Sequence, residues 1–288
     1  MEFRSQSFRP EDLDLLLAAM GAEGWVPSRA QLEALLVADP EGACVLLADG
    51  EAVGWVTTTA LMESGWLGNL IVQPAFRRRG LGTELAASGV ARLRDLGRET
   101  IRLEADPAGE GIYRRLGFVT EFESLRFRRP LGPDPVERGL PRGVEPSGLE
   151  GLSEFLAFDR PRYGDDRSAL LSALLPRAAR AFTFRRGREL AGFALAVPTA
   201  KGFQLGPWVA EDSEAAATLL GACLAAFPAG PGGREWVVGL PAPNRAGVAL
   251  LEAHGFAPYP ASVRMRLGPP RAAGRPECVF GLLNGAVG

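Results

Sequence analysis

The sequence has one histidine, three cysteines and almost no lysine, and these shortages exclude several kinds of site. Because His254 is the only histidine among 288 residues, no site in this chain uses two imidazoles. The cysteines, Cys44, Cys223 and Cys278, are odd in number and lack the spacing of metal ligands. They stand among apolar neighbours, which predicts buried free thiols. The pattern therefore predicts no metal site.

Long apolar runs and an excess of positive charge are also missing. No apolar run reaches the roughly 20 residues of a membrane span. The stretch LDLLLAAM is too short, and too acidic at its start, for a secretion signal. The 32 Lys and Arg residues face 34 Asp and Glu residues, and the pI is about 5.7. We therefore expect a cytoplasmic protein that binds neither nucleic acid nor a membrane.

The chain does have the length and composition of two ordinary domains. Of its 288 residues 47% are hydrophobic and 23% are charged, so each half can bury a core. The pair Asp49–Gly50 between two apolar runs indicates a hairpin. In the first half the expected helices are residues 11–20, 28–39, 81–96 and 109–116, and the expected strands are 2–9, 43–48, 51–60, 66–72, 100–105 and 118–127.

The second half of the chain repeats the first. ELAGFALAV resembles EAVGWVTTT, FQLGPWVAED resembles GWLGNLIVQP, and EWVVGLPAPNRAGVALLEAHGF resembles ETIRLEADPAGEGIYRRLGF. A constant offset of 138 residues separates three glycines from their counterparts, which are Gly54 and Gly192, Gly68 and Gly206, and Gly117 and Gly255. The constant offset predicts a tandem duplication of one α/β unit. Between the copies, proline and glycine crowd residues 128–146, which is the composition of a linker.

The stretch IVQPAFRRRGLGTEL, from Ile71 to Leu85, has the layout of a phosphate site. It follows an apolar strand and opens a helix, where the first backbone N–H groups have no intrahelical partner and the helix dipole is positive. Gly80 and Gly82 let the backbone approach a bulky anion closely. Positive charge beside this site would come from Arg77, Arg78 and Arg79.

Two motifs in this half resemble those of the GNAT N-acetyltransferase superfamily. The pattern V-x-P-x-x-R-x-x-G-x-G, at Val72, Pro74, Arg77, Gly80 and Gly82, resembles that superfamily's acetyl-CoA loop. The pattern Y-x-x-x-G-F, which starts at Tyr113, resembles its second motif at the usual separation. The resemblance covers residues 3–128, and the two-unit form is similar to the bacterial YitH-like acetyltransferases.

The resemblance implies an α/β fold of two tandem GNAT-like units, each with a mixed, mostly antiparallel central sheet flanked by helices. Residues 1–130 would form the catalytic acetyltransferase domain, and residues 131–145 the Pro/Gly-rich linker. Residues 146–288 would form a degenerate GNAT-like domain that shapes the substrate cleft. A monomer and a homodimer both remain open.

The resemblance also implies roles for residues of the first unit, with acetyl-CoA as co-substrate and no metal. Val72 would pair with the pantetheine arm, and the Leu70 N–H would stabilise the oxyanion. Tyr113 would protonate the leaving thiolate. Asp106 stands where many members have asparagine, so one cofactor contact departs from the family pattern. The implied cofactor-binding residues are Ile71, Val72, Arg77, Arg78, Arg79, Gly80, Leu81, Gly82, Thr83, Asp106 and Tyr113.

The acceptor amine must lose a proton, and a carboxylate base would help to remove it. Glu104 ends the strand before the Tyr113 helix and is the first candidate, with Glu23 and Glu63 as others. Trp25 lies between the first two helices, where GNAT folds place substrate-facing residues, and Glu23 lies beside it. A solvated surface charge for each glutamate and core packing for the tryptophan are the alternatives.

The second unit lacks the residues that would hold and use the cofactor. In WVAEDSEAAATLL, Glu214 replaces the arginine, and Ala217 and Leu219 replace the glycines. Leu251 stands at the position of Tyr113 and cannot donate a proton. Asn244 does occupy the motif's asparagine position, which leaves room for a remnant of the groove.

The function expected from these patterns is an N-acetyltransferase that moves the acetyl group of acetyl-CoA to a primary amine by direct attack in the first unit. The alternative is a non-catalytic acyl-CoA-binding sensor or scaffold that kept the loop. A sensor has no need for a positioned acid, so Tyr113 separates the two. A nucleic-acid binder ranks last because the pI is acidic.

Overall fold

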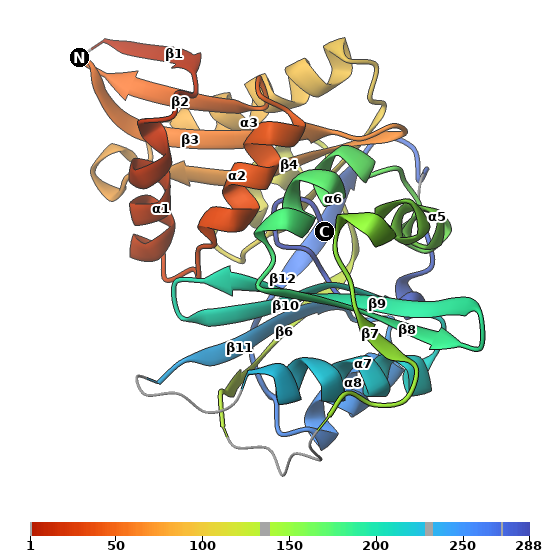
Figure 1. The fold of residues 1–288 in the computed structure, drawn as a ribbon. Coiled ribbons are helices and arrows are strands. Elements are labelled where there is room, and N and C mark those ends of the chain that lie inside the picture. The colour runs from red at the N-terminus through yellow and green to blue at the C-terminus, as the bar shows by residue number, and fades with distance from the viewer. Residues whose placement is uncertain (1, 133–138, 228–232, 272) are drawn as a thin grey trace.

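The computed structural model describes residues 2–132, 139–227, 233–271 and 273–288, and both sequence repeats fold as helices flanking strands (Figure 1). The first repeat contains β1 (Phe3–Ser7), α1 (Asp12–Ala22), α2 (Arg29–Ala38), β2 (Ala43–Ala48), β3 (Glu51–Ala60), β4 (Ser64–Val72), α3 (Leu81–Asp95), β5 (Thr100–Ala105), α4 (Glu110–Arg115) and β6 (Val119–Pro130). The second contains β7 (Val144–Pro146), α5 (Leu152–Tyr163), α6 (Ser168–Leu174), β8 (Arg180–Arg186), β9 (Glu189–Thr199), β10 (Gly202–Ala210), α7 (Ser213–Ala226), β11 (Glu235–Pro241), α8 (Arg245–Ala253), β12 (Ala257–Leu267) and β13 (Val279–Gly281).

Local sequence signals turn and end these elements as expected. Asp49 and Gly50 both have positive φ, 49° and 92°, so the hairpin between β2 and β3 closes with residues that tolerate this conformation. The Ser28 hydroxyl caps α2 by accepting from the N–H of Gln31 at 3.3 Å. Gly97 follows α3 with a φ of 79°, as a glycine that ends a helix does.

The strands of the described residues join one sheet. Its order is β1-β2-β3-β4-β5-β12-β6-β11-β10-β9-β8-β7, and β13 pairs with β10 off this path. The parallel pairs are β4 with β5 and β10 with β11, and the other neighbours are antiparallel. The expectation of a mixed, mostly antiparallel sheet flanked by helices in each repeat is confirmed.

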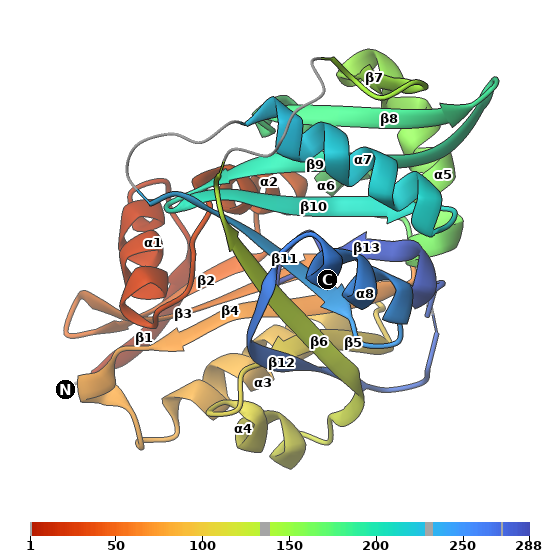
Figure 2. The ribbon, with the colours of Figure 1, turned by 90° about the horizontal axis from the view of Figure 1, so that it is seen from below.

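The two repeats exchange their last strands. β12, from the second repeat, pairs with β5 of the first, and β6, from the first repeat, pairs with β11 of the second. β6 and β12 also pair with each other, and Figure 2 shows them crossing the molecule between its two halves. Each half of the sheet is therefore completed by the other repeat, and side chains of β12 lie beside β5.

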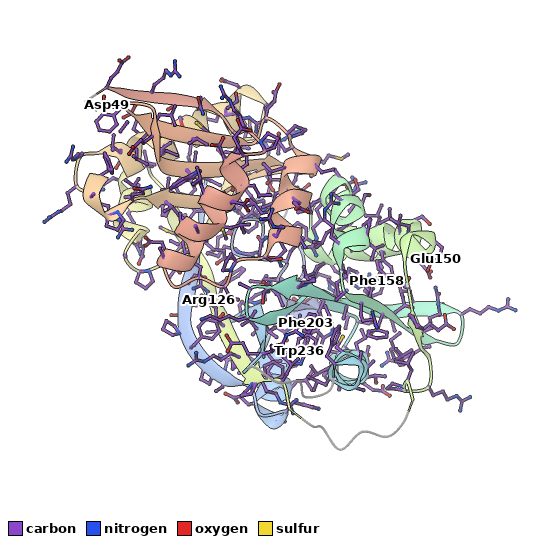
Figure 3. The ribbon with its side chains drawn as sticks, turned by 60° about the vertical axis from the view of Figure 1, so that its left-hand side comes forward. Asp49, Arg126, Glu150, Phe158, Phe203 and Trp236 are labelled. Carbon is purple, nitrogen blue, oxygen red and sulfur yellow. The ribbon has the colours of Figure 1, made fainter. Side chains whose placement is uncertain are left out.

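Buried apolar side chains form three clusters. One contains Leu85 and Leu93 on α3, and another, beside α7, contains Phe203 and Trp236, whose ring centroids are 5.4 Å apart (Figure 3). The third is common to both repeats. Its helices, α1 and α2 from the first repeat and α5 and α6 from the second, lie between the two halves of the sheet (Figure 1). A shared core and an exchanged strand together fix one repeat against the other.

The expected boundary after the first domain lies at the end of β6, one of the two exchanged strands. That strand ends at Pro130, the last residue of the expected first domain, but its ladder partners are β11 and β12. Within the expected linker, residues 133–138 lie outside the described residues, and β7 begins at Val144.

A buried ion pair in the second repeat gives a stability prediction. The Nε and Nη2 atoms of Arg167 each lie 2.8 Å from an oxygen of Asp159, and the two residues are only 2% and 1% exposed. Arg167→Met would leave the Asp159 carboxylate buried without its cation. We expect the free energy of unfolding in urea to fall by about 3–5 kcal/mol.

The control is a pair of the same chemistry on the surface. Arg271 and Glu99 are 3.1 Å apart with side chains 63% and 64% exposed. Arg271→Met should cost less than about 1 kcal/mol. Equal losses for the two variants would contradict a burial-dependent role for Arg167.

Candidate functional site

Strand β4 separates from its parallel neighbour β5 halfway along its length. Their pairing runs from Ser64 opposite Thr100 to Trp66 opposite Arg102 and goes no further. On the other side of β4, Asn69 and Leu70 together stand opposite the single residue Val56, and Asn69 has a φ of 48°. This bulge and the separation leave the second half of β4 without a ladder partner on the β5 side among the described residues.

The turn after β4 and the start of α3 present unpaired backbone donors. Gly80 adopts a φ of 84° and precedes α3, and Arg78 also has positive φ, 62°. Within the part of the chain that the structure describes, the N–H groups of Arg78, Gly80, Leu81 and Gly82 donate to no acceptor. Donors of this kind at the positive end of a helix form an anion site.

Side chains of the arginine run have different positions. Arg77 Nε donates to the carbonyl of Val72 at 2.8 Å, and its Nη2 pairs with Glu23, so this arginine ties the turn to the strand and to the end of α1. Arg78 lines the cavity described next. Arg79 instead lies over the ring of Phe76, 5.7 Å from its centroid, and is not among the lining residues.

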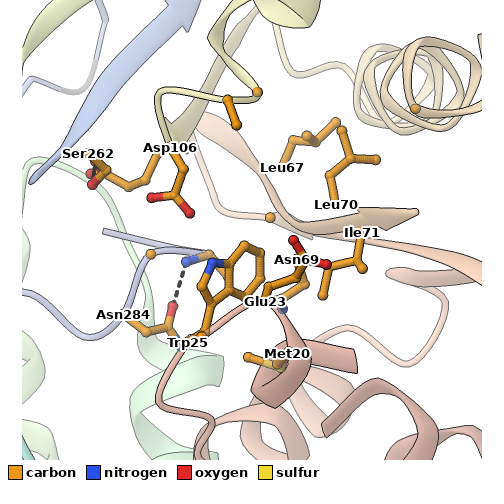
Figure 4. Close-up of a pocket in the computed structure, with 18 of the residues that line it drawn as sticks. Met20, Glu23, Trp25, Leu67, Asn69, Leu70, Ile71, Asp106, Ser262 and Asn284 are labelled. Carbon is orange, nitrogen blue, oxygen red and sulfur yellow. Dashed lines mark hydrogen bonds between the residues drawn. The ribbon is translucent and has the colours of Figure 1, made fainter. Parts of the chain in front are cut away.

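A cavity of about 880 Å³ joins the unpaired donors to the separation of β4 and β5. Figure 4 shows part of its lining, including Trp25 and Met20 from the α1–α2 region, Asn69 and Leu70 from the bulge, and Asp106. The predicted residues that line it are Glu23, Trp25, Leu70, Ile71, Val72, Arg77, Arg78, Gly80, Leu81, Gly82, Thr83, Glu104, Asp106 and Tyr113. The cavity therefore brings together all the predicted cofactor and catalytic residues except Arg79 and the alternative base Glu63.

Tyr113 on α4 is a buried phenol at the wall of this cavity. Its side chain packs edge-on against Phe118, with centroids 5.9 Å apart. Burial, and then the negative charge of Asp106, raise the pKa of the Tyr113 hydroxyl above its ordinary value near 10. Asp106 is itself paired with Arg126 at 2.8 Å. The phenol therefore carries its proton at neutral pH.

The carboxylates in the cavity wall have basic partners. Glu104 Oε1 accepts from Arg264 Nε at 2.9 Å, and Oε2 accepts from the Ser262 hydroxyl at 3.3 Å. Both partners come from β12, so the exchanged strand supplies the surroundings of Glu104. The Glu104 side chain is only 1% exposed. Glu23, the second candidate, pairs with Arg77, while Glu63 is exposed and lies outside the lining.

The lining also contains residues that the sequence did not suggest. Gln204, Tyr259, Ser262 and Asn284 all belong to the second repeat. Arg126, on β6, completes this part of the wall. A constant repeat offset predicts two self-contained units, and no motif in the sequence signals that the last strands change places.

In the second repeat the equivalent separation exists but is filled by the chain itself. The pairing of β10 with β11 ends at Gln204 opposite Val237. The segment after residue 278 enters beyond this point as β13, which pairs with β10 through Trp208 opposite Gly281. The N–H of Leu282 then donates to the carbonyl of Gly239 on β11 at 2.6 Å. An intramolecular strand thus occupies the space that is open beside β4.

Asn244 holds this strand in place. Its Oδ1 caps α8 by accepting from the N–H of Gly247 at 2.8 Å, and its Nδ2 donates to the carbonyl of Val279 on β13, also at 2.8 Å. The asparagine of the motif is therefore engaged with the protein's own backbone.

The prediction of buried free thiols can be compared with the positions of the three cysteines. Cys223 and Cys278 are buried and unpaired as predicted, while Cys44 is unpaired but only partly buried. Among the described residues, no three His, Cys, Asp or Glu side chains gather as a metal site would require. In the helices of the same residues we find none with the length and apolarity of a transmembrane segment.

Comparison with known proteins points to one family for both repeats. A model of the "Acetyltransferase (GNAT) family" matches residues 10–118, and a model of an "Acetyltransferase (GNAT) domain" matches residues 155–281. The chain is 26% identical over 211 residues to the holothin acyltransferase of Pseudoalteromonas sp. (strain SANK 73390), covering 73% of this chain and 70% of that protein. It is also 26% identical over 222 residues to the Uncharacterized N-acetyltransferase YitH of Bacillus subtilis (strain 168), covering 77% of each.

A solved structure shares the whole architecture. A crystal structure from Pyrococcus horikoshii superimposes with a TM-score of 0.82 at 25% sequence identity, covering 99% of this chain and 96% of that one. The match over nearly the full length includes both repeats.

The burial of the tyrosines gives a prediction about pH. The chain has three, and burial raises the pKa of each, to about 12 for Tyr163. Tyrosines in the unfolded state lose their protons near pH 10, while the buried tyrosines of the folded state keep theirs to higher pH. Above pH 10 deprotonation therefore stabilises the unfolded state relative to the folded state. Stability should therefore fall as pH rises through 10 toward the folded pKa values.

Ultraviolet absorbance of the phenolate measures this directly. At pH 10 native protein should show less phenolate than protein in guanidinium, which should be about half ionised there. Tyr113→Phe should remove one of the three late-titrating groups. A native titration that coincides with the unfolded one would contradict the burial of these phenols.

Proposed function

Because the chain belongs to the GNAT acetyltransferase superfamily and is an acyltransferase, we propose that it moves an acetyl group from acetyl-CoA to a primary amine by direct attack in its first repeat. The observation that carries this proposal is the set of unpaired N–H groups at Arg78, Gly80, Leu81 and Gly82, at the mouth of the 880 Å³ cavity. A pyrophosphate is an acceptor of the size and charge that such donors bind.

The free edge of β4 supports binding of the pantetheine arm. The N–H of Gln73 donates to Val53 on β3, so alternation along the strand turns the N–H and carbonyl of Val72 toward the opposite, open side. The Val72 carbonyl accepts a hydrogen bond from the Arg77 side chain, so the Val72 N–H remains for an amide carbonyl of the pantetheine arm. Adding an extended ligand to a free strand edge is a common mode of recognition.

The bulge places the Leu70 backbone where it is useful for acyl transfer. In a regular strand, successive backbone N–H groups point to opposite edges of the strand. The extra residue of the bulge at Asn69–Leu70 interrupts this alternation beside the cavity. We assign to the Leu70 N–H a hydrogen bond to the thioester oxygen, which strengthens as negative charge develops there. Removing one such donor costs an enzyme about 10²–10³ in kcat.

Tyr113 is the proposed acid for the departing thiolate. A phenol with the ordinary pKa near 10 is already protonated over the neutral range, and the Tyr113 side chain borders the cavity. The charge of Asp106 opposes phenolate formation, which keeps the phenol protonated but makes it a weaker acid toward the thiolate. In this assignment the Asp106 carboxylate pairs with Arg126, and its charge acts on the pKa of the Tyr113 phenol.

An alkylamine with a pKa near 10 is neutral in about one part in a thousand at pH 7, which costs roughly 4 kcal/mol. We propose that Glu104 receives the proton, through Oε2 and the Ser262 hydroxyl. That oxygen has the longer hydrogen bond, while Oε1 is held by Arg264. Arg264 positions the carboxylate.

The second repeat is proposed to shape the acceptor cleft and to bind no cofactor. Its lining residues, including Gln204 and Asn284, support the first role. Occupation of its own strand separation by β13 supports the second, because an arm and a strand cannot use the same edge.

Calorimetry with acetyl-CoA tests the binding part of the proposal. We expect one equivalent per chain. Gly80→Val places a β-branched side chain at a φ of 84° at the start of α3, which distorts the donors, and it should weaken binding at least tenfold. Gly97→Val is the matched control, because Gly97 has a φ of 79° at the other end of the same helix.

Neither glycine has a neighbour within 4 Å of an added Cβ, so the two variants should lose similar stability while only Gly80→Val loses affinity. Two equivalents of acetyl-CoA in the unaltered chain would refute a filled second groove. Absence of binding would refute the acyl-transfer proposal.

Turnover of Tyr113→Phe tests the chemical part. We expect acetyl-CoA affinity to persist while kcat falls about 10²-fold, because only the proton donor is removed. Tyr259→Phe is the control, since it removes another phenol from the same cavity wall. Equal kcat for Tyr113→Phe and the unaltered chain would remove Tyr113 from catalysis, and a chain that binds acetyl-CoA but acetylates no amine would be a sensor.

A further inference from the structure

The turn after β13 lies in the acceptor part of the cavity. We propose that the acceptor is a small monoamine with an uncharged body, and that this turn, residues 283–287, is the wall that selects it. This inference rests on the proposed acetyltransferase function and names its substrate class. Three independent features carry it, which are the anchoring of the turn, its position against β4 and the charge of the cavity wall.

Both repeats anchor the turn through one backbone carbonyl. Gln31 on α2 and Gln204 on β10 each donate an amide N–H to the carbonyl of Leu283, at 2.7 and 2.6 Å. Gln204 also donates to the carbonyl of Leu282 at 3.1 Å. A carbonyl shared by side chains from two repeats fixes the place of the turn in the cavity.

The turn is also closed by its own hydrogen bonds. Asn284 Oδ1 accepts from the N–H of Ala286 at 2.8 Å and of Val287 at 3.1 Å. The buried hydroxyl of Tyr163 donates to the carbonyl of Val287 at 2.7 Å. With its backbone and its only polar side chain engaged in this way, the turn presents a preformed surface to a ligand.

The turn packs directly against β4, one residue before the bulge. A Cβ added to Gly68 would lie 2.4 Å from the Cβ of Ala286, so glycine is required there for the close approach. Leu70, the proposed oxyanion donor, is two residues further along the strand, about 7 Å away. A small acceptor that attacks a thioester held by the Leu70 N–H would therefore lie close enough to contact Ala286. Figure 4 shows Trp25 and Asn284, from different repeats, in the same part of the cavity.

The charge of the wall excludes a polycation. The described lining contains three carboxylates, and each is paired with an arginine: Glu23 with Arg77, Glu104 with Arg264, and Asp106 with Arg126. Two of these paired arginines, Arg77 and Arg126, line the cavity themselves, and the other arginines of the lining are Arg78 and Arg115. No unneutralised acid in it is available to hold a second ammonium group. The remaining polar groups near the turn are amides and hydroxyls, which suit a neutral body.

Initial rates with acetyl-CoA and matched amines test the substrate class. Hexylamine and 1,6-diaminohexane differ in one terminal cation, and we expect kcat/KM to be at least tenfold higher for the monoamine. Comparing kcat/KM for phenethylamine with kcat/KM for propylamine then measures how large an amine substituent the cavity accepts. Equal or better use of the diamine, or of spermidine, would overturn the proposed class.

Variants of Ala286 test the wall. Ala286→Leu should lower kcat/KM for phenethylamine at least tenfold relative to propylamine, while Ala286→Gly should shift the ratio the other way. The KM for acetyl-CoA should stay within twofold in both, which a general disturbance of the fold would not allow. The conservative Gly variant keeps the test valid where the larger side chain prevents folding.

The outcomes separate this inference from the proposed function. If the unaltered chain acetylates amines but both variants keep its amine profile, the wall is refuted and the acetyltransferase stands. If the unaltered chain binds acetyl-CoA and acetylates none of these amines, the proposed function fails, and this inference fails with it.

Discussion

The pairing of β12 with β5 is the interaction on which the rest of the site depends. Without that exchange, β5 would be covered by β6 of its own repeat, and Glu104 would face other residues than Arg264 and Ser262. The exchange is kept in place by the core that α1, α2, α5 and α6 share between the halves of the sheet. Strand pairing and apolar burial both connect the two repeats, so residues of each repeat line the cavity. The shape of the cavity therefore requires that both repeats are folded.

The two repeats use one structural device in two ways. In each, a parallel pair separates after three residue pairs and a bulge interrupts the strand that leads to a helix. Beside β4 the separation stays open and leads to unpaired helix donors. Beside β10 it holds β13, and Gly206 permits this because a Cβ there would lie 2.0 Å from the Leu282 carbonyl. Duplication thus supplied a second groove that the chain fills with its own backbone, and the same segment then continues into the first groove's cavity.

Much of the first repeat could be predicted from the sequence, because its signals are local. Asp49–Gly50, Ser28 and Gly97 each determine a turn or a helix end through their own backbone or side chain, and Gly80 does the same for the start of α3. The constant offset between glycines likewise showed the duplication. The position of β12 could not be predicted, because an exchanged strand and an unexchanged one have the same apolar pattern and bury the same face. The partners of Glu104 follow from that exchange and were missed with it. The role of Asn244 and the turn at Asn284 follow instead from the position of β13 beside β10, and they were missed as well.

The charge of the cavity bears on how an acceptor amine loses its proton. All three carboxylates of the lining are paired with arginines, so the wall does little to stabilise an ammonium ion, and partial burial acts against it. Each unit by which such surroundings lower the pKa of a bound amine removes about 1.4 kcal/mol of the roughly 4 kcal/mol that deprotonation costs at neutral pH. A site that rejects polycations is for the same reason one that favours the neutral, nucleophilic form of a monoamine. In the proposed mechanism, selectivity for the acceptor and its activation then have a common physical origin, and less is demanded of Glu104 as the proposed base.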